Sequence, residues 1–291
     1  MVASSPSVLR ARDGLELALS RRPVDHPHAL CLVVHGYAEH AGRYDGLTRA
    51  LADDGVETFA VDLRGHGRSA GTRADVRDFG DYVQDVLVLG EHARAQRPGL
   101  PVVVFGHSMG GTVALRLALE HGDALDALVL SAPFLRPSSP PPAWLLGLSS
   151  FLARAAPQLP VQSLDVRTLS RDVAEVESYR EDPLNYNGRI KARMGHALVT
   201  AGAPLLARAN ALGVPTLIVH GAADRLADPH ASEELAARMP REMVTLRLYP
   251  GAYHELLNDL DREAVLADIR DWLRERAGLQ PSSTRNTRNL R

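Results

Sequence analysis

The sequence predicts an α/β protein in which helices cover both faces of a mostly parallel central sheet. Short apolar runs alternate with longer amphipathic stretches over most of the chain, which is the pattern of parallel strands joined by helices. A proline-rich break that begins at Pro133 interrupts the alternation, which resumes near residue 214. The 291 residues therefore indicate one large domain with an insertion between two sheet strands.

The N-terminal part is expected to begin with a hairpin. Two β-like runs, residues 8–11 and 15–20, flank the turn signal Asp13-Gly14. Residues 30–34 are all apolar, as expected of a strand that is buried on both faces. The alternation then predicts strands at residues 58–61, 102–105 and 127–130, and helices at residues 44–54, 79–97 and 109–120.

The insertion contains an apolar stretch, residues 143–153, with a tryptophan, four leucines and a phenylalanine. It is too short to span a bilayer and suits either a helix packed on the sheet or a flap at a lipid interface. We favour the flap, because the stretch leaves the sheet where a lid would lie. After the insertion we expect strands at residues 214–219 and 244–248 and helices at residues 231–238 and 262–276.

These patterns predict three parts of the chain. The core comprises residues 1–132 and 203–278, the cap comprises residues 133–202, and residues 279–291 form a disordered tail. The composition is that of an ordinary globular protein, and the net charge of −2 gives no electrostatic argument for a nucleic-acid partner. Cys31 is the only cysteine, so no intrachain disulfide can form.

Targeting signals are not apparent in the sequence. The N-terminal residues lack the apolar core of a secretory signal, and no uninterrupted apolar run reaches about 18 residues. We therefore expect a soluble, cytoplasmic protein, whose cap could make transient contact with a membrane surface. No sequence feature fixes an oligomeric state.

The segment around Ser108 has the pattern of a nucleophile elbow. Residues 106–110 (Gly-His-Ser-Met-Gly) follow an apolar strand and precede a helix, which is the setting that the G-x-S-x-G turn requires. The turn leaves little room for side chains two residues before and after the serine, and glycine stands at both positions. Ser108 would lie at a helix N-terminus, which favours developing negative charge. The plainer alternative is a structural turn.

A nucleophilic serine needs a histidine to accept its proton, and the imidazole needs a carboxylate that fixes its tautomer. In elbows of this kind the acid and then the histidine follow the serine, each after a strand. Asp224 follows the strand at residues 214–219 and is the expected acid, with Asp228 as the alternative. His254 is the one histidine after the strand at residues 244–248 and is the expected base.

A tetrahedral intermediate also needs N–H donors aimed at its oxygen. One donor is expected to be the backbone N–H of Met109, the residue after the nucleophile. The other is expected from the loop that follows residues 30–34, with the N–H of Tyr37 as our choice. This chemistry requires neither a metal ion nor an organic cofactor, and we expect neither.

Four segments carry a family resemblance: residues 35–44, 62–69, 106–111 and 170–172. The pattern H-G-x-x-E-H-x-x-R-Y in the first is the discriminating one, because very many esterases share G-x-S-x-G. Together the segments resemble the monoacylglycerol lipase and lysophospholipase branch of the α/β-hydrolases. The resemblance extends over most of the chain, and it implies an α/β-hydrolase fold with a Ser108–Asp224–His254 triad and a cap that holds an acyl channel.

The resemblance further implies a polar pocket for a glycerol end near Glu39 and Arg43. At positions i and i+4 these two side chains could contact the substrate directly or could pair with each other as a scaffold. The implied reaction is hydrolysis of a small lipid ester, a monoacylglycerol, to fatty acid and glycerol through an acyl-enzyme. Lysophospholipase and general carboxylesterase are the alternatives. A non-enzymatic lipid-binding module fits an intact triad poorly, and no acidic pair that could hold a peptidase substrate's amine is apparent.

Overall fold

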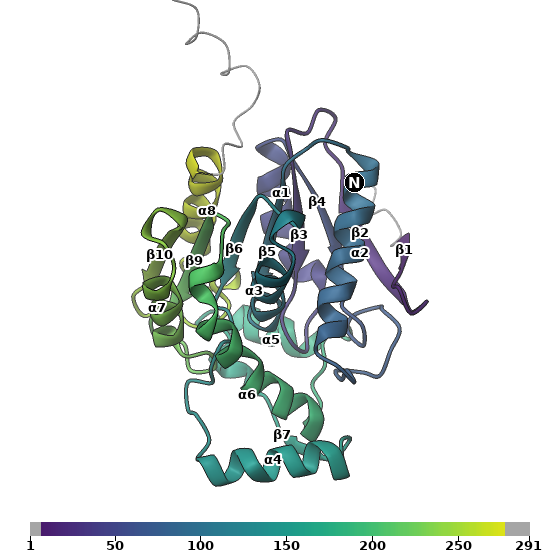
Figure 1. Cartoon of the computed structure of the whole chain (residues 1–291), viewed down its shortest axis with the longest axis vertical. Coiled ribbons are helices and arrows are strands. Elements are labelled where there is room, and N and C mark those ends of the chain that lie inside the picture. Colours follow the sequence, from purple (N-terminus) through teal and green to yellow (C-terminus); the bar gives the residue numbers. More distant parts are fainter. Residues whose placement is uncertain (1–6, 277–291) are drawn as a thin grey trace, which may run out of the picture.

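The structure, a computed structural model, describes residues 7–276. Its centre is an eight-stranded sheet in the order β1-β2-β4-β3-β5-β6-β9-β10 (Figure 1). β2 pairs antiparallel with β1 and with β4, and all pairings from β4 to β10 are parallel. The strands are β1 (Ser7–Arg10), β2 (Glu16–Arg22), β3 (Ala29–Val34), β4 (Val56–Val61), β5 (Val102–His107), β6 (Ala127–Ser131), β9 (Thr216–Gly221) and β10 (Val244–Tyr249).

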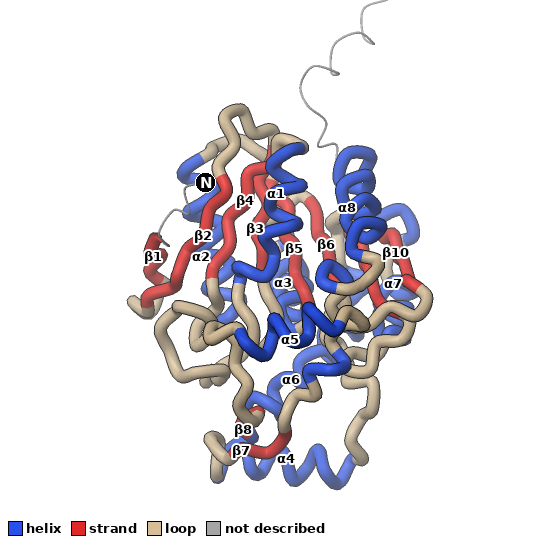
Figure 2. Tube along the Cα trace, turned by 180° about the vertical axis from the view of Figure 1, so that it is seen from behind, coloured by secondary structure: helices blue, strands red, loops and turns tan. Residues whose placement is uncertain are grey.

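Helices cover both faces of the sheet, as Figures 1 and 2 show from opposite sides. One face packs against α2, α3, α6 and α7, and the other packs against α1 and α8. The expected α/β class with a mostly parallel sheet is therefore confirmed. The helices of the two layers are α1 (Asp45–Asp53), α2 (Gly80–Gln96), α3 (Met109–Glu120), α6 (Ala192–Ala207), α7 (Pro229–Arg238) and α8 (Arg262–Arg276).

The all-apolar sequence of β3 follows from its place in the middle of the sheet. Successive side chains of a strand point to opposite faces. Leu30 and Leu32 pack in the core beneath α2 and α3, whereas Cys31 and Val33 pack in the core beneath α1 and α8. Both sets of side chains are almost fully buried.

The chain leaves the sheet between β6 and β9. This insertion contains α4, β7, α5, β8 and α6, and α4 lies at the end of the molecule farthest from the sheet (Figure 1). α6 runs through residue 202, where the cap boundary was expected, and packs against α3. A Cβ at Gly202 would lie 1.9 Å from the carbonyl oxygen of Leu135, so only glycine permits this approach. The remaining bounds are α4 (Ala143–Ala155), β7 (Pro160–Gln162), α5 (Val173–Glu181) and β8 (Ile190–Lys191).

Several elements differ from their predicted bounds. β5 continues to His107, directly before Ser108, and β2 continues to Arg22 along its pairing with β4. α1 begins at Asp45, because a short 3₁₀ turn (Ala41–Tyr44) precedes it. The predicted tail lies outside the described residues. None of the helices within residues 7–276 is long and apolar enough to cross a membrane.

Candidate active site

Ser108 occupies a sharp turn between β5 and α3. Its φ of 52° and ψ of −119° are strained for a residue with a side chain. A Cβ at Gly106 would lie 2.5 Å from the carbonyl oxygen of Gly110, and a Cβ at Gly110 would lie 2.2 Å from that of Val34. The two glycines therefore permit the backbone contacts that close the turn. They leave the Ser108 hydroxyl at the N-terminus of α3.

His254 lies between Ser108 and Asp224. Its Nε2 is 2.8 Å from the Ser108 Oγ, and its Nδ1 is 2.6 Å from the Asp224 Oδ2. A carboxylate only accepts, so Nδ1 carries the proton and Nε2 is free to accept from the hydroxyl. The three residues lie in the turn or loops that follow β5, β9 and β10, and all are buried. The arrangement can pass the serine proton to the imidazole.

Asp224, and not Asp228, makes this contact. The Asp228 side chain instead accepts from the N–H of His230 at the start of α7 and pairs with Arg136. Burial favours the neutral form of Asp224, but the charge of His254 and hydrogen bonds from His254 and His220 outweigh it and hold its pKa below the ordinary range. Burial likewise opposes the charge on His254, but the Asp224 carboxylate holds the pKa of His254 above its ordinary value.

Two backbone N–H groups lie beside Ser108 without a protein acceptor among the described residues, those of Tyr37 and Met109. Met109 begins α3, where N–H groups have no partner within the helix. Tyr37 follows Gly36, whose N–H donates to the Glu39 Oε1 over 2.5 Å. Both residues line the cavity that Ser108 and His254 also line. These are the two donors that the sequence predicts for a developing oxyanion.

Glu39 and Arg43 pair with each other, and Glu255 completes the cluster. Arg43 Nε lies 3.1 Å from the Glu39 Oε2, and its other arm contacts the Glu255 carboxylate. All three side chains are at most 7% exposed. The hydroxyl of Tyr44 donates to the Glu39 Oε1 over 2.6 Å. Burial and the neighbouring Glu255 carboxylate raise the pKa of Glu39 to about 7, although Arg43 and Tyr44 favour its charged form.

A cavity of about 560 Å³ opens above Ser108. Its wall near the serine includes Glu39 and Glu255, whereas Arg43 lies behind them and does not line it. Most of the remaining wall comes from the insertion and is apolar. The aliphatic side chains in this part are Leu145, Leu146, Leu152, Val161, Leu164, Leu169, Ile190, Leu198 and Val199.

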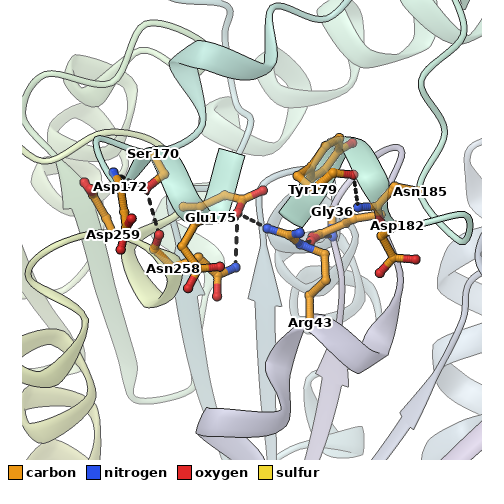
Figure 3. A network of polar contacts seen from close by, with 12 residues as sticks. Gly36, Arg43, Ser170, Asp172, Glu175, Tyr179, Asp182, Asn185, Asn258 and Asp259 are labelled. Carbon is orange, nitrogen blue, oxygen red and sulfur yellow. Dashed lines mark hydrogen bonds and ion pairs between the residues drawn. The ribbon is translucent and has the colours of Figure 1, made fainter. Parts of the chain in front are cut away.

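Three residues near this site had no predicted role. His220 contacts Asp224 over 3.1 Å. Glu255 directly follows His254, and the guanidinium carbon of Arg43 lies 4.7 Å from the centre of the Tyr179 ring (Figure 3). The sequence offered a signal for the first two, because His220 lies four residues before Asp224 and Glu255 directly follows His254. Within residues 7–276, no group of three or more histidine, cysteine, aspartate or glutamate side chains could hold a metal ion.

A family model described as serine aminopeptidase, S33, matches residues 25–261. The chain belongs to this family. The monoacylglycerol lipase of Mycolicibacterium smegmatis is 37% identical over 251 residues, which are 86% of this chain and 90% of that protein. The monoglyceride lipase of Homo sapiens is 36% identical over 259 residues, which are 88% of this chain and 85% of that protein.

Solved structures agree with this membership. The crystal structure of Paleococcus ferrophilus monoacylglycerol lipase has a TM-score of 0.81 at 30% identity and covers 89% of this chain and 98% of its own. A soluble variant of Saccharomyces cerevisiae monoglyceride lipase in complex with a substrate analog has a TM-score of 0.80 at 25% identity. The match covers 93% of this chain and 96% of that chain. The predicted α/β-hydrolase fold and the family resemblance are both confirmed.

Proposed function

We propose that this protein is a serine hydrolase that cleaves monoacylglycerols to a free fatty acid and glycerol. The observation that carries the proposal is the 2.8 Å contact between the Ser108 Oγ and the His254 Nε2, in a cavity whose wall away from the serine is mostly apolar. Relatives that cover most of the chain and carry the names monoacylglycerol lipase and monoglyceride lipase support this choice of substrate.

In the acylation step, His254 takes the proton of Ser108 as the oxygen attacks the ester carbonyl. The resulting oxyanion accepts from the N–H groups of Tyr37 and Met109, and Asp224 stabilises the imidazolium that forms. Collapse of the intermediate breaks the ester bond, and His254 returns the proton to the departing glycerol oxygen. Water, deprotonated by His254, then attacks the acyl-enzyme by the same route and releases the fatty acid.

Glu39 and Glu255 are suited to accept hydrogen bonds from glycerol hydroxyls, because both line the cavity near Ser108. Arg43 does not line the cavity, and we assign it a scaffold role that keeps the two carboxylates in place. With one cation between two carboxylates, the cluster does not attract a phosphate group. It therefore suits a neutral polyol better than the headgroup of a lysophospholipid.

We propose that the insertion, with the expected limits 133–202, acts as the cap and supplies the acyl channel. Residues of the insertion provide most of the cavity wall away from Ser108, and aliphatic side chains are the largest group among them. Helix α4 also exposes Trp144 and Phe151, by 70% and 64%. We assign these exposed side chains to transient contact with a membrane surface during substrate uptake, by a protein that is otherwise cytoplasmic.

One pair of measurements tests the proposal. Ser108→Ala should abolish hydrolysis of a monoacylglycerol and labelling by a fluorophosphonate, while its thermal unfolding stays close to that of the wild type. Rates on monoacylglycerols of increasing chain length should exceed those on lysophosphatidylcholine and triacylglycerol. Faster cleavage of lysophosphatidylcholine would favour a lysophospholipase, and preference for acetyl esters would favour a general carboxylesterase. Full activity in Ser108→Ala would contradict the mechanism.

The Glu39–Glu255 pair also favours a second candidate, cleavage next to a free amino group. Two adjacent carboxylates are the groups that could hold an ammonium ion, and the sequence did not indicate them. Arg43 argues against this candidate, because it bonds both carboxylates and repels a cation. Faster hydrolysis of an aminoacyl naphthylamide than of a monoacylglycerol would support the peptidase.

A further inference from the structure

The loop that carries the Tyr37 N–H contains a strained residue. Ala38 has a φ of +66°, in the left-handed region that residues with a side chain seldom adopt. Such a backbone persists only where its surroundings hold it. On the other side of Tyr37, the N–H of Gly36 is held by Glu39. The direction of the Tyr37 N–H therefore depends on whatever holds Ala38.

Two donors from the insertion hold the carbonyl of Ala38. The hydroxyl of Tyr179 donates to this oxygen over 2.9 Å, and the backbone N–H of Tyr186 donates to it over 2.8 Å. Together they can occupy both lone pairs of the oxygen. A third contact lies beside them, because the His40 Nε2 is 2.9 Å from an Asp182 carboxylate oxygen. Figure 3 shows Tyr179 and Asp182 near Gly36.

The same segment is anchored at its other end to the loop that carries His254. The carbonyl of Leu169 accepts from the N–H of Glu255 over 2.8 Å. Ser170 donates to the carbonyl of Asn258 over 2.7 Å, a contact that Figure 3 also shows. Arg171 Nε lies 2.9 Å from the Asp259 carboxylate. We call residues 169–186 the brace.

The brace differs from helix α4 of the same insertion. The brace residues Leu169, Val176 and Tyr179 are at most 6% exposed. No residue of α4 is buried. The insertion therefore combines a segment fixed to the core with a helix that lies away from it.

We propose that the brace, acting through the Tyr179 hydroxyl and the Ala38 carbonyl, positions the oxyanion loop relative to the loop of His254. This inference rests on the proposed roles of Tyr37 and His254. It makes Tyr179 a positioning residue and makes this part of the insertion a fixed component of the catalytic machinery. Any movement that opens the cavity would then be confined to the segment that contains α4.

The kinetic consequence follows from when the oxyanion exists. A donor aimed at that oxygen acts in the transition state and hardly at all on bound substrate. A shifted Tyr37 N–H should therefore lower kcat and leave KM nearly unchanged, and it should do so for every ester, since all form the same oxyanion.

Tyr179→Phe tests the inference directly. The variant keeps the ring beneath Arg43 and removes only the donor to Ala38. We expect kcat to fall about 10-fold on both p-nitrophenyl butyrate and a monoacylglycerol, less than the roughly 100-fold or greater loss when an oxyanion donor is deleted. Affinity for a trifluoromethyl ketone, whose adduct places an oxyanion in the same position, should fall by the same factor as kcat/KM.

Tyr249→Phe is the matched control. It removes a partly buried tyrosine hydroxyl that bonds Asp268 over 2.6 Å, outside the site. Asp182 offers a second variant pair. Asp182→Asn keeps one acceptor oxygen, which can serve His40 or the N–H of Leu184 but not both, so it should lower kcat less than Asp182→Ala does.

The outcomes separate the two proposals. If Tyr179→Phe keeps a kcat within twofold of that of Tyr249→Phe on both esters, the proposed role of the brace is wrong. A loss confined to the monoacylglycerol would also overturn it, and would place the role of Tyr179 in the polar pocket. A wild-type protein that cleaves the butyrate ester but no monoacylglycerol would contradict the proposed substrate. The comparison of Tyr179→Phe with Tyr249→Phe on the butyrate ester would still test the proposed role of the brace.

Discussion

His220 donates a hydrogen bond to the same carboxylate oxygen of Asp224 that His254 contacts, over 3.1 Å. Because a carboxylate only accepts, the Nε2 of His220 carries a proton, and its Nδ1 accepts from the Ser232 hydroxyl 2.7 Å away. The other oxygen of Asp224 accepts two backbone N–H groups. A chain of buried contacts therefore links α7 to the Ser108 hydroxyl.

His220 should position Asp224 for catalysis. His220→Leu removes the donor at nearly constant volume and should lower kcat about 10- to 100-fold, the scale expected when a catalytic group is misplaced. His220→Gln keeps an N–H donor and should retain most of the activity. Ser232→Ala removes only the distant contact and is the control. Steady-state kinetics on p-nitrophenyl butyrate measures the effect, and a His220→Leu variant with unchanged kcat would contradict it.

The rate should depend on pH through His254. The base must be neutral, so kcat/KM should rise with pH through the pKa of this imidazole in the free enzyme. Asp224 holds that pKa above the ordinary value of 6.5, and the midpoint of the acid limb should therefore lie above 6.5. A pH profile on p-nitrophenyl butyrate measures it. A midpoint well below 6.5 would mean that burial, and not the Asp224 carboxylate, determines the pKa of His254.

The raised pKa of His254 should make stability fall over the pH range in which activity rises. A histidine whose pKa is raised by folding stabilises the protein fully below its unfolded pKa, and this contribution is lost as the pH rises through the folded pKa. Its share of the free energy of unfolding therefore falls over the pH range in which activity appears. Ser108→Ala, which keeps His254 and Asp224, is the variant in which to follow this titration without turnover.

Arg43 should be more important for stability than most arginines in this chain. Arg43→Met leaves Glu39 and Glu255 buried without their cation, and we expect a loss of about 3 kcal/mol or more near pH 8. The pKa of Glu39, already raised by burial, would rise further in this variant. The loss of unfolding free energy should therefore shrink as the pH falls toward the pKa of Glu39 in the unfolded chain and the buried carboxyl is protonated.

Denaturant unfolding at pH 8 and pH 5 measures this difference. Arg270→Met is the control, because Arg270 pairs with Asp54 at the surface and is 30% exposed. Its loss should cost under about 1 kcal/mol at either pH. Equal losses for the two variants would contradict the buried-cluster interpretation.

The sheet and the triad could be predicted from the sequence because their signals are local. β3 is wholly apolar, Ser108 is bracketed by glycines, and both Asp224 and His254 closely follow a strand end. The partners of the cluster could not be predicted in this way. Arg43 and Glu255 are 212 residues apart, and Tyr179 is 141 residues from Ala38. Such pairs depend on how the insertion and the loops pack on the core, which leaves no periodic pattern in the sequence.

Helix α4 should mediate contact with lipid. Trp144, Leu148 and Phe151 follow at intervals of four and three residues, so they lie on one face, and they are 70%, 42% and 64% exposed. A double variant, Trp144→Ser with Phe151→Ser, should weaken binding to phosphatidylcholine vesicles by roughly 10-fold or more, from the apolar area lost. Its rate on soluble p-nitrophenyl butyrate should not change.

Val8→Ser controls for the loss of an exposed apolar side chain elsewhere, because Val8 is 58% exposed on the edge strand β1. For Val8→Ser, vesicle co-sedimentation and the rate on vesicle-embedded monoacylglycerol should both match those of the wild type. If the α4 variant binds vesicles as well as Val8→Ser does, its exposed face has no lipid role, and the apolar residues of α4 serve only to line the cavity from the other side of the helix.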